Sequence, residues 1–248
     1  MPSSKYQYPY ETHFHKNLGF KILSDRKAYD YVKAIVEPVE DTQIVFSDSK
    51  AGTGKTSLAM AAAHYRIMEG QSTKIIYVRN TLAVRENGYL PGTAAEKEFQ
   101  FMAPAKESID DIGYRLGDQK LFENMMTYDQ IEVVSTSYLR GRDLSGDIVL
   151  ILDEAQNLDT TEIQTVLTRL HDTAKVIVIG SSRQCDNKKL RRFGRDRITP
   201  FQLYIEHFKR QSDIPTKIVD LEVNYRGNLA NYADEIGQTI DAITDRDN

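Results

Sequence analysis

The sequence predicts an α/β fold, in which helices cover both faces of a parallel sheet. Three observations support this prediction. Short aliphatic runs of strand length alternate with stretches of helical periodicity along most of the chain. A glycine-rich string at 49–56 directly follows one such run. Another run, 148–152, is apolar at every position, as expected of a strand buried on both faces, and it ends in the acidic pair Asp153-Glu154.

The expected elements follow from hydrophobic periodicity and from start and stop signals. Strands are predicted at 43–47, 75–78, 131–134, 148–152, 176–179 and 218–221. Helices are predicted at 25–36, from Lys55 to about Gly70, from Asp159 to near Leu170, over the basic segment 187–210 and at 229–241. The long stretch 81–130 is helical in its middle, with breaks expected at Pro91 and Pro104. Strands that alternate with helices favour parallel pairing with right-handed crossovers.

Length and composition indicate one domain with appendages. The 248 residues are enough for a sizeable core, and we expect a single domain over 21–248. Residues 1–20 are polar and aromatic, which predicts an arm that packs on the domain or on a partner. The net charge of −4 excludes a global attraction to nucleic acid, so any basic surface must be local.

Cysteine usage and hydropathy indicate the compartment. The single cysteine, Cys185, excludes an intramolecular disulfide, which suits a reducing cytosol. The first residues lack the apolar segment of a signal peptide. The longest aliphatic run has five residues, far fewer than a membrane-spanning helix needs. We therefore expect a cytoplasmic protein that does not contact a membrane.

The glycine-rich string is predicted to bind phosphate. A turn of this kind between a strand and a helix directs successive backbone N–H groups at an anion. Lys55 is expected to reach the β- and γ-phosphates of a nucleoside triphosphate, and the Thr56 hydroxyl to bind Mg²⁺. Ser49 stands where this motif usually begins with glycine, so the first turn cannot use glycine's conformational freedom. The predicted nucleotide-binding residues are Ser49, Lys50, Ala51, Gly52, Thr53, Gly54, Lys55, Thr56 and Ser57.

The acidic pair adds hydrolysis to binding. A carboxylate at the carboxyl end of a buried parallel strand faces the crevice where α/β sheets bind ligands. Asp153 is therefore expected to hold the Mg²⁺ shell. Glu154 is expected to polarise the attacking water as general base. The alternative for the pair is a cap at the end of a strand.

Three further strings lie beside predicted strands. Gln184 follows the strand that ends at Gly180, where it is expected near the γ-phosphate. Arg226, in Asn224-Tyr225-Arg226, is expected to meet the transferred phosphate after the last strand. The third string, 138–142, precedes the acidic strand. Each string taken singly also fits a solvated cap.

Taken together, these strings resemble the PhoH family, ATPases similar to the first RecA-like motor domain of superfamily-one helicases. The resemblance covers 20–226 and is carried by AGTGKT at 51–56, ENGYLPG at 86–92, YLRGR at 138–142, ILDEAQN at 151–157, LTRL at 167–170 and the Gln184 loop. It implies a P-loop NTPase of RecA-like fold with ATP and Mg²⁺ as ligands. Thr56 and Asp153 would carry the metal, and Glu154 would activate water. Gln156 and Gln184 would couple the nucleotide state to the rest of the domain, and Arg226 would be the γ-phosphate arginine.

Two positions depart from the family pattern. Gly180-Ser181 stands where the family usually has Gly-Asp, which removes one acidic contact. The stretch 23–27 lacks the glutamine that related helicases use to read adenine. The preference for adenine therefore has no support from that contact.

A catalytic arginine has two possible sources. Related helicases hydrolyse ATP between two RecA-like domains, and with 22 residues after Arg226 a second such domain is not expected in this chain. Arg226 acts within its own chain, or a neighbouring subunit supplies an arginine. The second source implies a head-to-tail homo-oligomer such as a ring. The candidate arginines in trans are Arg140, Arg142 and Arg169.

A basic stripe follows the Gln184 loop. Residues 183–197 contain seven basic and two acidic side chains, a net charge of about +5. Such a stripe can neutralise phosphates of RNA or single-stranded DNA, and Phe193 can stack on a base. A solvated helix face or a subunit contact explains the stripe equally well. The candidate nucleic-acid contacts are Lys188, Lys189, Arg191, Arg192, Arg195 and Arg197.

The sequence thus predicts ATP hydrolysis coupled to RNA or single-stranded nucleic acid, with helicase-like remodelling as an extension. One alternative is a nucleotide-dependent scaffold with little turnover, which Ser49 and Ser181 favour. Another is a P-loop kinase, in which Glu154 would deprotonate a hydroxyl. A GTPase is disfavoured, because the string at 187–190 lacks the aspartate of a guanine-reading motif.

Overall fold

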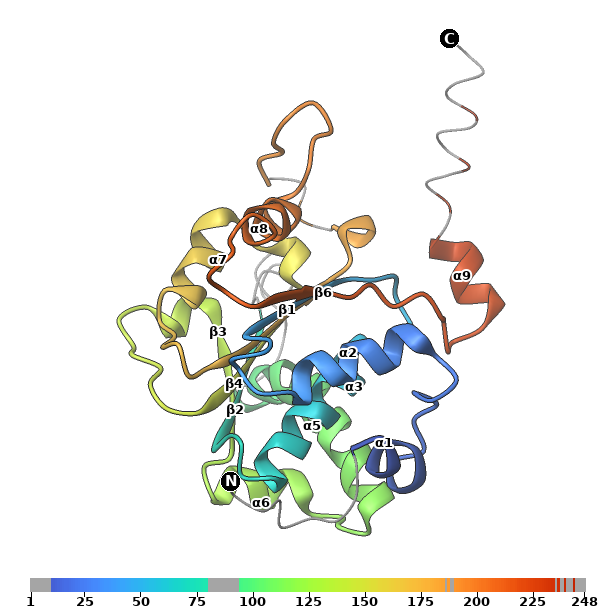
Figure 1. Ribbon diagram of the computed structural model, residues 1–248, viewed down its shortest axis with the longest axis vertical. Coiled ribbons are helices and arrows are strands. Elements are labelled where there is room, and N and C mark those ends of the chain that lie inside the picture. Colours follow the sequence, from blue (N-terminus) through green and yellow to red (C-terminus); the bar gives the residue numbers. More distant parts are fainter. Residues whose placement is uncertain are drawn as a thin grey trace.

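A six-stranded parallel sheet forms the centre of the molecule (Figure 1). The computed structural model describes residues 10–79, 94–185, 187, 190–234, 236, 239 and 243. Within them the strand order is β3-β2-β4-β5-β1-β6 and every pairing is parallel. The strands are β1 (Ile44–Asp48), β2 (Lys74–Arg79), β3 (Ile131–Ser135), β4 (Ile148–Asp153), β5 (Lys175–Gly180) and β6 (Thr216–Ile218). The order brings the carboxyl ends of β1, β5 and β4 together, and these ends carry the predicted motifs.

Helices cover both faces of the sheet, as predicted. They are α1 (Tyr10–Thr12), α2 (Arg26–Val36), α3 (Lys55–Met68), α5 (Ala94–Leu116), α6 (Leu121–Thr127), α7 (Thr160–Leu167), α8 (Pro200–Phe208) and α9 (Asn228–Asp234). Figure 1 shows α2, α3 and α5 on one side of the sheet and α7 and α8 on the other. No helix in the described part of the chain combines the length and the apolarity needed to cross a membrane.

Alternation along the strands divides the core into two layers. In β4, Val149 and Ile151 belong to the cluster beneath α2, α3 and α5. Leu150 and Leu152 belong to the cluster beneath α7 and α8. Successive side chains of a strand point to opposite faces, so a strand covered on both sides must be apolar throughout. All six residues of β4 are buried accordingly.

The described part of the N-terminal region packs on the first of these layers. Phe14 and Leu18 are completely buried in the core. The Arg115 guanidinium of α5 donates to the Leu18 carbonyl at 2.6 Å and lies over the Phe20 ring. Residues 10–20 are therefore tied to α5 by packing and by a hydrogen bond.

The expected break at Pro104 is wrong, because this proline lies inside the 23-residue α5. Proline in a helix interior removes one backbone hydrogen bond. Burial compensates here, since Ala105, Ile109 and Ile112 are completely buried against the core. Pro91 lies outside the described residues.

The expected helix over the basic segment 187–210 is wrong for residues 190–199, whereas residues 200–208 are helical. Residues 190–199 form a loop, closed by an antiparallel bridge between Phe193 and Ile198. Gly194 and Arg197 have positive φ angles, which a helix does not accommodate. Helix α8 begins only at Pro200, with Thr199 accepting from the Gln202 N–H as its N-cap.

The bounds of α7 and β6 also differ from expectation. Helix α7 begins with the predicted capping box of Asp159 and Glu162 but ends at Leu167, not near Leu170. Strand β6 covers 216–218 and not 218–221. After Ile218 the chain runs beside the phosphate-binding loop. There the Leu221 N–H donates to the Ser49 hydroxyl at 2.8 Å and not to a backbone carbonyl.

Candidate nucleotide-binding site

The glycine-rich string forms a loop between β1 and α3. Gly52 and Gly54 have φ angles of +76° and +77°, which favour glycine. A Cβ atom at Gly52 would lie 2.6 Å from Asn224 Oδ1, so no other residue fits at this position. Gly54 is the N-cap of the 14-residue α3. The unpaired N–H groups and the positive end of that helix therefore face the loop, as an anion site requires.

Lys55 and Thr56 occupy the first turn of α3. The Lys55 ammonium donates to the Lys50 carbonyl at 3.3 Å, so its side chain folds back over the loop. The Thr56 hydroxyl donates to Asp153 Oδ2 at 3.3 Å. The fold thus joins the phosphate-binding loop to the acidic pair at the end of β4.

The residues around Asp153 fit a magnesium ion bound together with a nucleotide. Asp153 is buried, and its other oxygen accepts from the Glu154 N–H at 2.9 Å. Magnesium is usually held by one or two protein oxygens together with water and substrate phosphates. No cluster of three or more acidic, histidine or cysteine side chains that could hold a metal occurs among the described residues. A single carboxylate beside a hydroxyl is the donor set expected when phosphates complete the shell.

Glu154 is half-buried and has an unusual backbone. Its φ and ψ angles of 56° and 36° lie in the left-handed region. The buried Gln156 amide donates to Glu154 Oε2 at 2.6 Å, and the Gln156 side-chain oxygen accepts from the Ser181 N–H at 2.9 Å. Gln156 therefore connects the predicted general base to the end of β5. A Cβ at Gly180 would lie 2.7 Å from this same oxygen, so the contact also requires glycine there.

The Gln184 loop is tied to both neighbouring strand ends. Gln184 is exposed and ends a short 3₁₀ turn over 182–184. The Ser182 N–H donates to Asp48 Oδ1 at 2.7 Å, at the end of β1. The Cys185 thiol donates to the Gln156 backbone carbonyl at 3.2 Å, in the turn after β4. A displacement of this loop would therefore reach the turn that carries Glu154.

The segment 224–226 docks on the phosphate-binding loop. The Asn224 amide donates to the Ala51 carbonyl at 3.1 Å, and the Tyr225 N–H donates to the Gly52 carbonyl at 2.9 Å. The Arg226 stem lies 3.0 Å from the position of a Gly52 Cβ. The fold thus brings this exposed arginine beside the loop of its own chain.

Ser49 needs no positive φ, although glycine usually opens this motif. It is not among the described residues whose φ is positive. Its hydroxyl shares a 2.6 Å hydrogen bond with Ser47 and accepts from the Leu221 N–H at 2.8 Å. The serine therefore fastens the loop to the chain that follows β6, a contact that glycine cannot make.

A cavity beside the loop extends the site. It has a volume of about 310 Å³, and its walls include Phe20, Ile22, Gly54, Leu58, Arg115 and Tyr225. The Tyr225 hydroxyl donates to Asp25 Oδ2 at 2.9 Å, and Asp25 is the N-cap of α2. The cavity therefore lies between the start of α3 and the chain leading into α2.

Comparison with known proteins identifies the family of this chain. The family profile described as "PhoH-like protein" matches residues 26–218. The chain belongs to the PhoH family. The ENGYLPG string of that resemblance, at 86–92, lies outside the described residues.

Several PhoH relatives have similar sequences. The PhoH-like protein of Mycobacterium leprae is 39% identical over 155 residues, which is 62% of this chain and 43% of that protein. The PhoH-like protein of Bacillus subtilis is 34% identical over 175 residues, 70% of this chain and 51% of the relative. Protein PhoH of Escherichia coli is 35% identical over 163 residues, 63% and 42% of the two chains. The chain thus spans about half the length of the curated relatives it matches.

Among solved structures, the large terminase of a thermophilic bacteriophage in complex with ADP is similar, with a TM-score of 0.44 and 10% identity. The similarity covers 79% of this chain and 45% of the terminase.

The three candidate trans arginines of this PhoH-family chain differ in their surroundings. Arg142 forms two hydrogen bonds with Glu132, at 2.7 and 3.2 Å, and this pairing lowers the pKa of Glu132. Arg169 is half-buried, and its Nε atom has no hydrogen-bond partner in the described structure. Arg140 is exposed. Arg140 is therefore the most accessible of the three to a neighbouring subunit.

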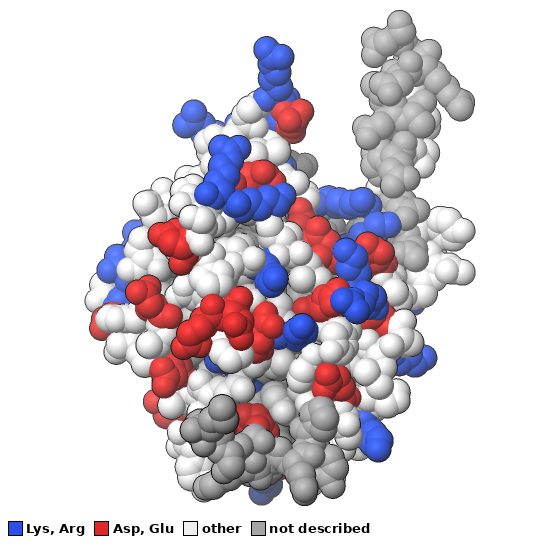
Figure 2. Space-filling view, viewed as in Figure 1, with Lys and Arg blue, Asp and Glu red and all other residues white. Residues whose placement is uncertain are grey.

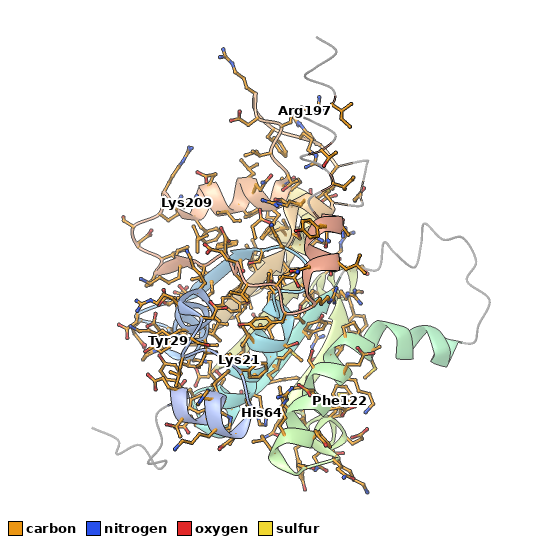
Figure 3. All side chains as sticks on the ribbon, turned by 90° about the vertical axis from the view of Figure 1, so that its right-hand side faces the viewer. Lys21, Tyr29, His64, Phe122, Arg197 and Lys209 are labelled. Atoms are coloured by element: carbon orange, nitrogen blue, oxygen red, sulfur yellow. The ribbon has the colours of Figure 1, made fainter. Side chains whose placement is uncertain are left out.

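The described candidate nucleic-acid arginines, Arg191, Arg192, Arg195 and Arg197, lie on the 190–199 loop and not on a helix face. Arg191, Arg195 and Arg197 are exposed, and the Arg191 guanidinium lies over the Phe193 ring at 5.1 Å. Arg192 is half-buried, and Lys188 and Lys189 lie outside the described residues. Figure 2 shows Lys and Arg side chains gathered on the projecting part at the top of the view, and Figure 3 places Arg197 there.

One residue of the site was missed by the sequence reasoning. The Tyr77 hydroxyl, on β2, donates to Asp153 Oδ2. The available signal was a tyrosine inside an otherwise aliphatic buried strand, because a buried hydroxyl needs a hydrogen-bond partner.

Proposed function

We propose that this chain is a Mg²⁺-dependent ATPase whose turnover is coupled to the binding of RNA or single-stranded DNA. The contact of Thr56 with Asp153, with Glu154 next in the chain, carries the proposal. It assembles a phosphate-binding helix start, a pair of metal-binding oxygens and a general base at one edge of the sheet.

The residues divide the chemistry among them. The loop N–H groups and Lys55 hold the phosphates, and Thr56 and Asp153 hold the metal. Bound Mg²⁺ would neutralise charge that develops on the β- and γ-phosphate oxygens. Glu154 accepts a proton from the attacking water, after its carboxylate exchanges the Gln156 amide for that water. Arg226 supplies positive charge from beside Gly52.

The cavity beside Gly54 is proposed to hold the base of the nucleotide. Its apolar walls, Phe20, Ile22 and Leu58, suit a flat aromatic ring, as in most nucleotide sites. The glutamine with which related helicases read adenine is absent from 23–27, so the proposal of adenine rests on membership of the PhoH family alone.

The 190–199 loop is proposed to contact the nucleic acid. Its exposed arginines can pair with phosphates, and Phe193 offers a ring for stacking. Earlier in the chain, the Cys185 thiol and the Asn187 amide donate to the backbone carbonyls of Gln156 and Asn157, in the turn after β4. Binding at the loop would therefore reach Glu154 over a short chain of contacts. Helicase-like remodelling would be an extension of this coupling.

A homo-oligomer, with a ring as one form, is proposed as the working assembly. Its support is the exposed Arg140 at the carboxyl edge of the sheet, where a neighbouring copy's nucleotide can approach. An arginine in trans would add to Arg226 or replace it.

Phosphate release tests the proposal. We expect hydrolysis of ATP in preference to GTP, stimulation by single-stranded RNA or DNA, and loss of turnover in Glu154→Gln with nucleotide binding retained. Tight nucleotide binding without turnover in the wild type would favour the scaffold, and transfer to a hydroxyl acceptor would favour the kinase.

A further inference from the structure

The Tyr77 hydroxyl lies behind the carboxylate of Asp153. Tyr77 is completely buried on β2. This strand pairs directly with β4, the strand that ends at Asp153. Its hydroxyl donates to Asp153 Oδ2, the same oxygen that Thr56 contacts from the other motif. A phenol carries its proton at neutral pH, so the Tyr77 hydroxyl is the donor and the carboxylate the acceptor.

Three donors together fix the Asp153 carboxylate. The Glu154 N–H holds Oδ1 at 2.9 Å, while Thr56 and Tyr77 hold Oδ2. Rotation of the carboxylate would break these bonds and leave a buried charge without its donors, which is costly. Thr56 would share its hydroxyl between Asp153 and a bound Mg²⁺, because it is itself one of the expected metal-binding residues. Tyr77 would not bind the metal, so its hydroxyl is a side-chain donor committed to Oδ2 alone.

A second tyrosine provides a matched comparison. Tyr31, on α2, is also completely buried, and its pKa is raised by burial and by the charge of Asp153. Its hydroxyl, however, has no hydrogen-bond partner in the described structure. Tyr77 and Tyr31 are thus both buried phenols, but only Tyr77 is hydrogen-bonded to Asp153.

We propose that Tyr77 is a positioning residue for the magnesium carboxylate, and that its hydroxyl holds Asp153 in the orientation that binds the metal. The inference rests on the metal site of the proposed function. Hydrogen-bond partners of metal-binding side chains orient them, and their loss typically lowers metal affinity by about 10–100-fold. Phenylalanine would fill nearly the same space as Tyr77 in β2. Replacing Tyr77 by phenylalanine therefore removes only the hydroxyl and its hydrogen bond to Asp153.

The test compares Tyr77→Phe with Tyr31→Phe. The affinity for a fluorescent ADP analogue is measured with Mg²⁺ and with EDTA, and thermal unfolding is followed in parallel. In the wild type, Mg²⁺ should tighten binding. Tyr77→Phe should lose most of that gain, about tenfold, and keep its metal-free affinity, whereas Tyr31→Phe should match the wild type in both.

Turnover gives an independent reading. In Tyr77→Phe the Mg²⁺ concentration for half-maximal hydrolysis should rise about tenfold, with most of kcat recovered at saturating Mg²⁺. Tyr77→Leu, with the aliphatic side chain typical of this strand, should behave in the same way and replaces Tyr77→Phe if that variant does not fold.

The outcomes separate the inference from the function on which it rests. A wild type whose nucleotide affinity ignores Mg²⁺ would overturn the proposed metal site itself. A wild type that responds to Mg²⁺, together with a Tyr77→Phe variant that responds equally, would overturn only the role of Tyr77. An equal loss in Tyr31→Phe would also overturn it, because Tyr31 has no direct bond to Asp153.

Discussion

The Gln156 side-chain amide donates to the Glu154 carboxylate at 2.6 Å, while its side-chain oxygen accepts from the Ser181 N–H at 2.9 Å. One buried side chain thus spans the ends of β4 and β5. In this arrangement an amide engages the proposed general base, and in the proposed reaction the attacking water would displace that contact. The basic loop 190–199 follows Cys185, whose thiol donates to the Gln156 backbone carbonyl, so nucleic acid bound at that loop would act on the same residue as the water.

Replacing Gln156 should therefore affect both stability and turnover. Gln156→Met removes the acceptor of the Ser181 N–H, and an unsatisfied buried donor costs about 1–3 kcal/mol of unfolding free energy. Turnover should fall, with its stimulation by RNA reduced further. Denaturant unfolding and phosphate release measure the two effects. The exposed Gln164→Met is the control and should change stability by less than about 0.5 kcal/mol. Unaltered RNA stimulation in Gln156→Met would contradict the coupling.

Arg226 should act within its own chain. Its stem packs against Gly52, so Arg226→Ala is expected to lower kcat by about 10³, the lower end of the usual range for such arginines. Mixing Arg226→Ala with Lys55→Ala should restore no activity, because each chain lacks part of the same site. Recovered activity would show that the arginine acts in trans. Arg140→Ala, mixed in the same way, tests the neighbouring-subunit contribution, and the exposed Arg210→Ala serves as control.

Ser49 should stabilise the loop. Ser49→Gly restores the residue usual in this motif but removes the acceptor of the buried Leu221 N–H. We expect a loss of about 1–3 kcal/mol in unfolding free energy, measured by denaturant titration, with nucleotide affinity changed little. Ser137→Ala, at an exposed serine, is the comparison. A Ser49→Gly variant as stable as the wild type would show that this contact contributes nothing.

Charge reversal on the basic loop should weaken nucleic-acid binding. Arg191→Glu combined with Arg192→Glu is expected to lower RNA affinity at least about tenfold at low salt. The slope of log affinity against log salt concentration should become shallower by about one to two. Fluorescence anisotropy over a salt series measures both. Lys209→Glu with Arg210→Glu makes the same change in charge outside the loop. If the two double variants bind RNA equally, the site lies elsewhere.

Stability should fall on acidification because of His64. This histidine is buried between the N-terminal segment and α5 (Figure 3), and burial, with the nearby His13, lowers its pKa to about 4. Between about pH 6.5 and 4, His64 is therefore protonated in the unfolded state but neutral in the folded state. The contribution is fully present above pH 6.5 and is lost as the pH falls through the folded-state pKa.

His64→Leu should therefore flatten the pH dependence of the melting temperature between pH 7 and 4. The loss it removes is on the order of 2–3 kcal/mol. The exposed His207→Gln is the control and should leave the profile as it is in the wild type. A wild-type profile that is flat over this range would contradict the prediction.

Local chemistry explains which expectations succeeded. The capping box of Asp159 and Glu162 is formed within one helical turn, so its residues and spacing determine it. The strand β4 is apolar at every position before Asp153, which is enough to indicate burial on both faces. The expectations at Pro104 and at 190–199 failed because helix propensity was read without packing. Burial keeps α5 intact through the proline, and the bridge at Phe193 turns the basic segment into a loop.

The sequence by itself determined the phosphate-binding loop and the acidic strand end, because backbone conformation and residue order define both within a few positions. The tertiary structure alone decided which distant groups meet there. The sheet order brings Tyr77 to Asp153, and the chain after β6 brings Asn224 and Leu221 to the loop. The physical reason is that these contacts depend on the pairing of strands far apart in the chain, which neither propensity nor spacing specifies.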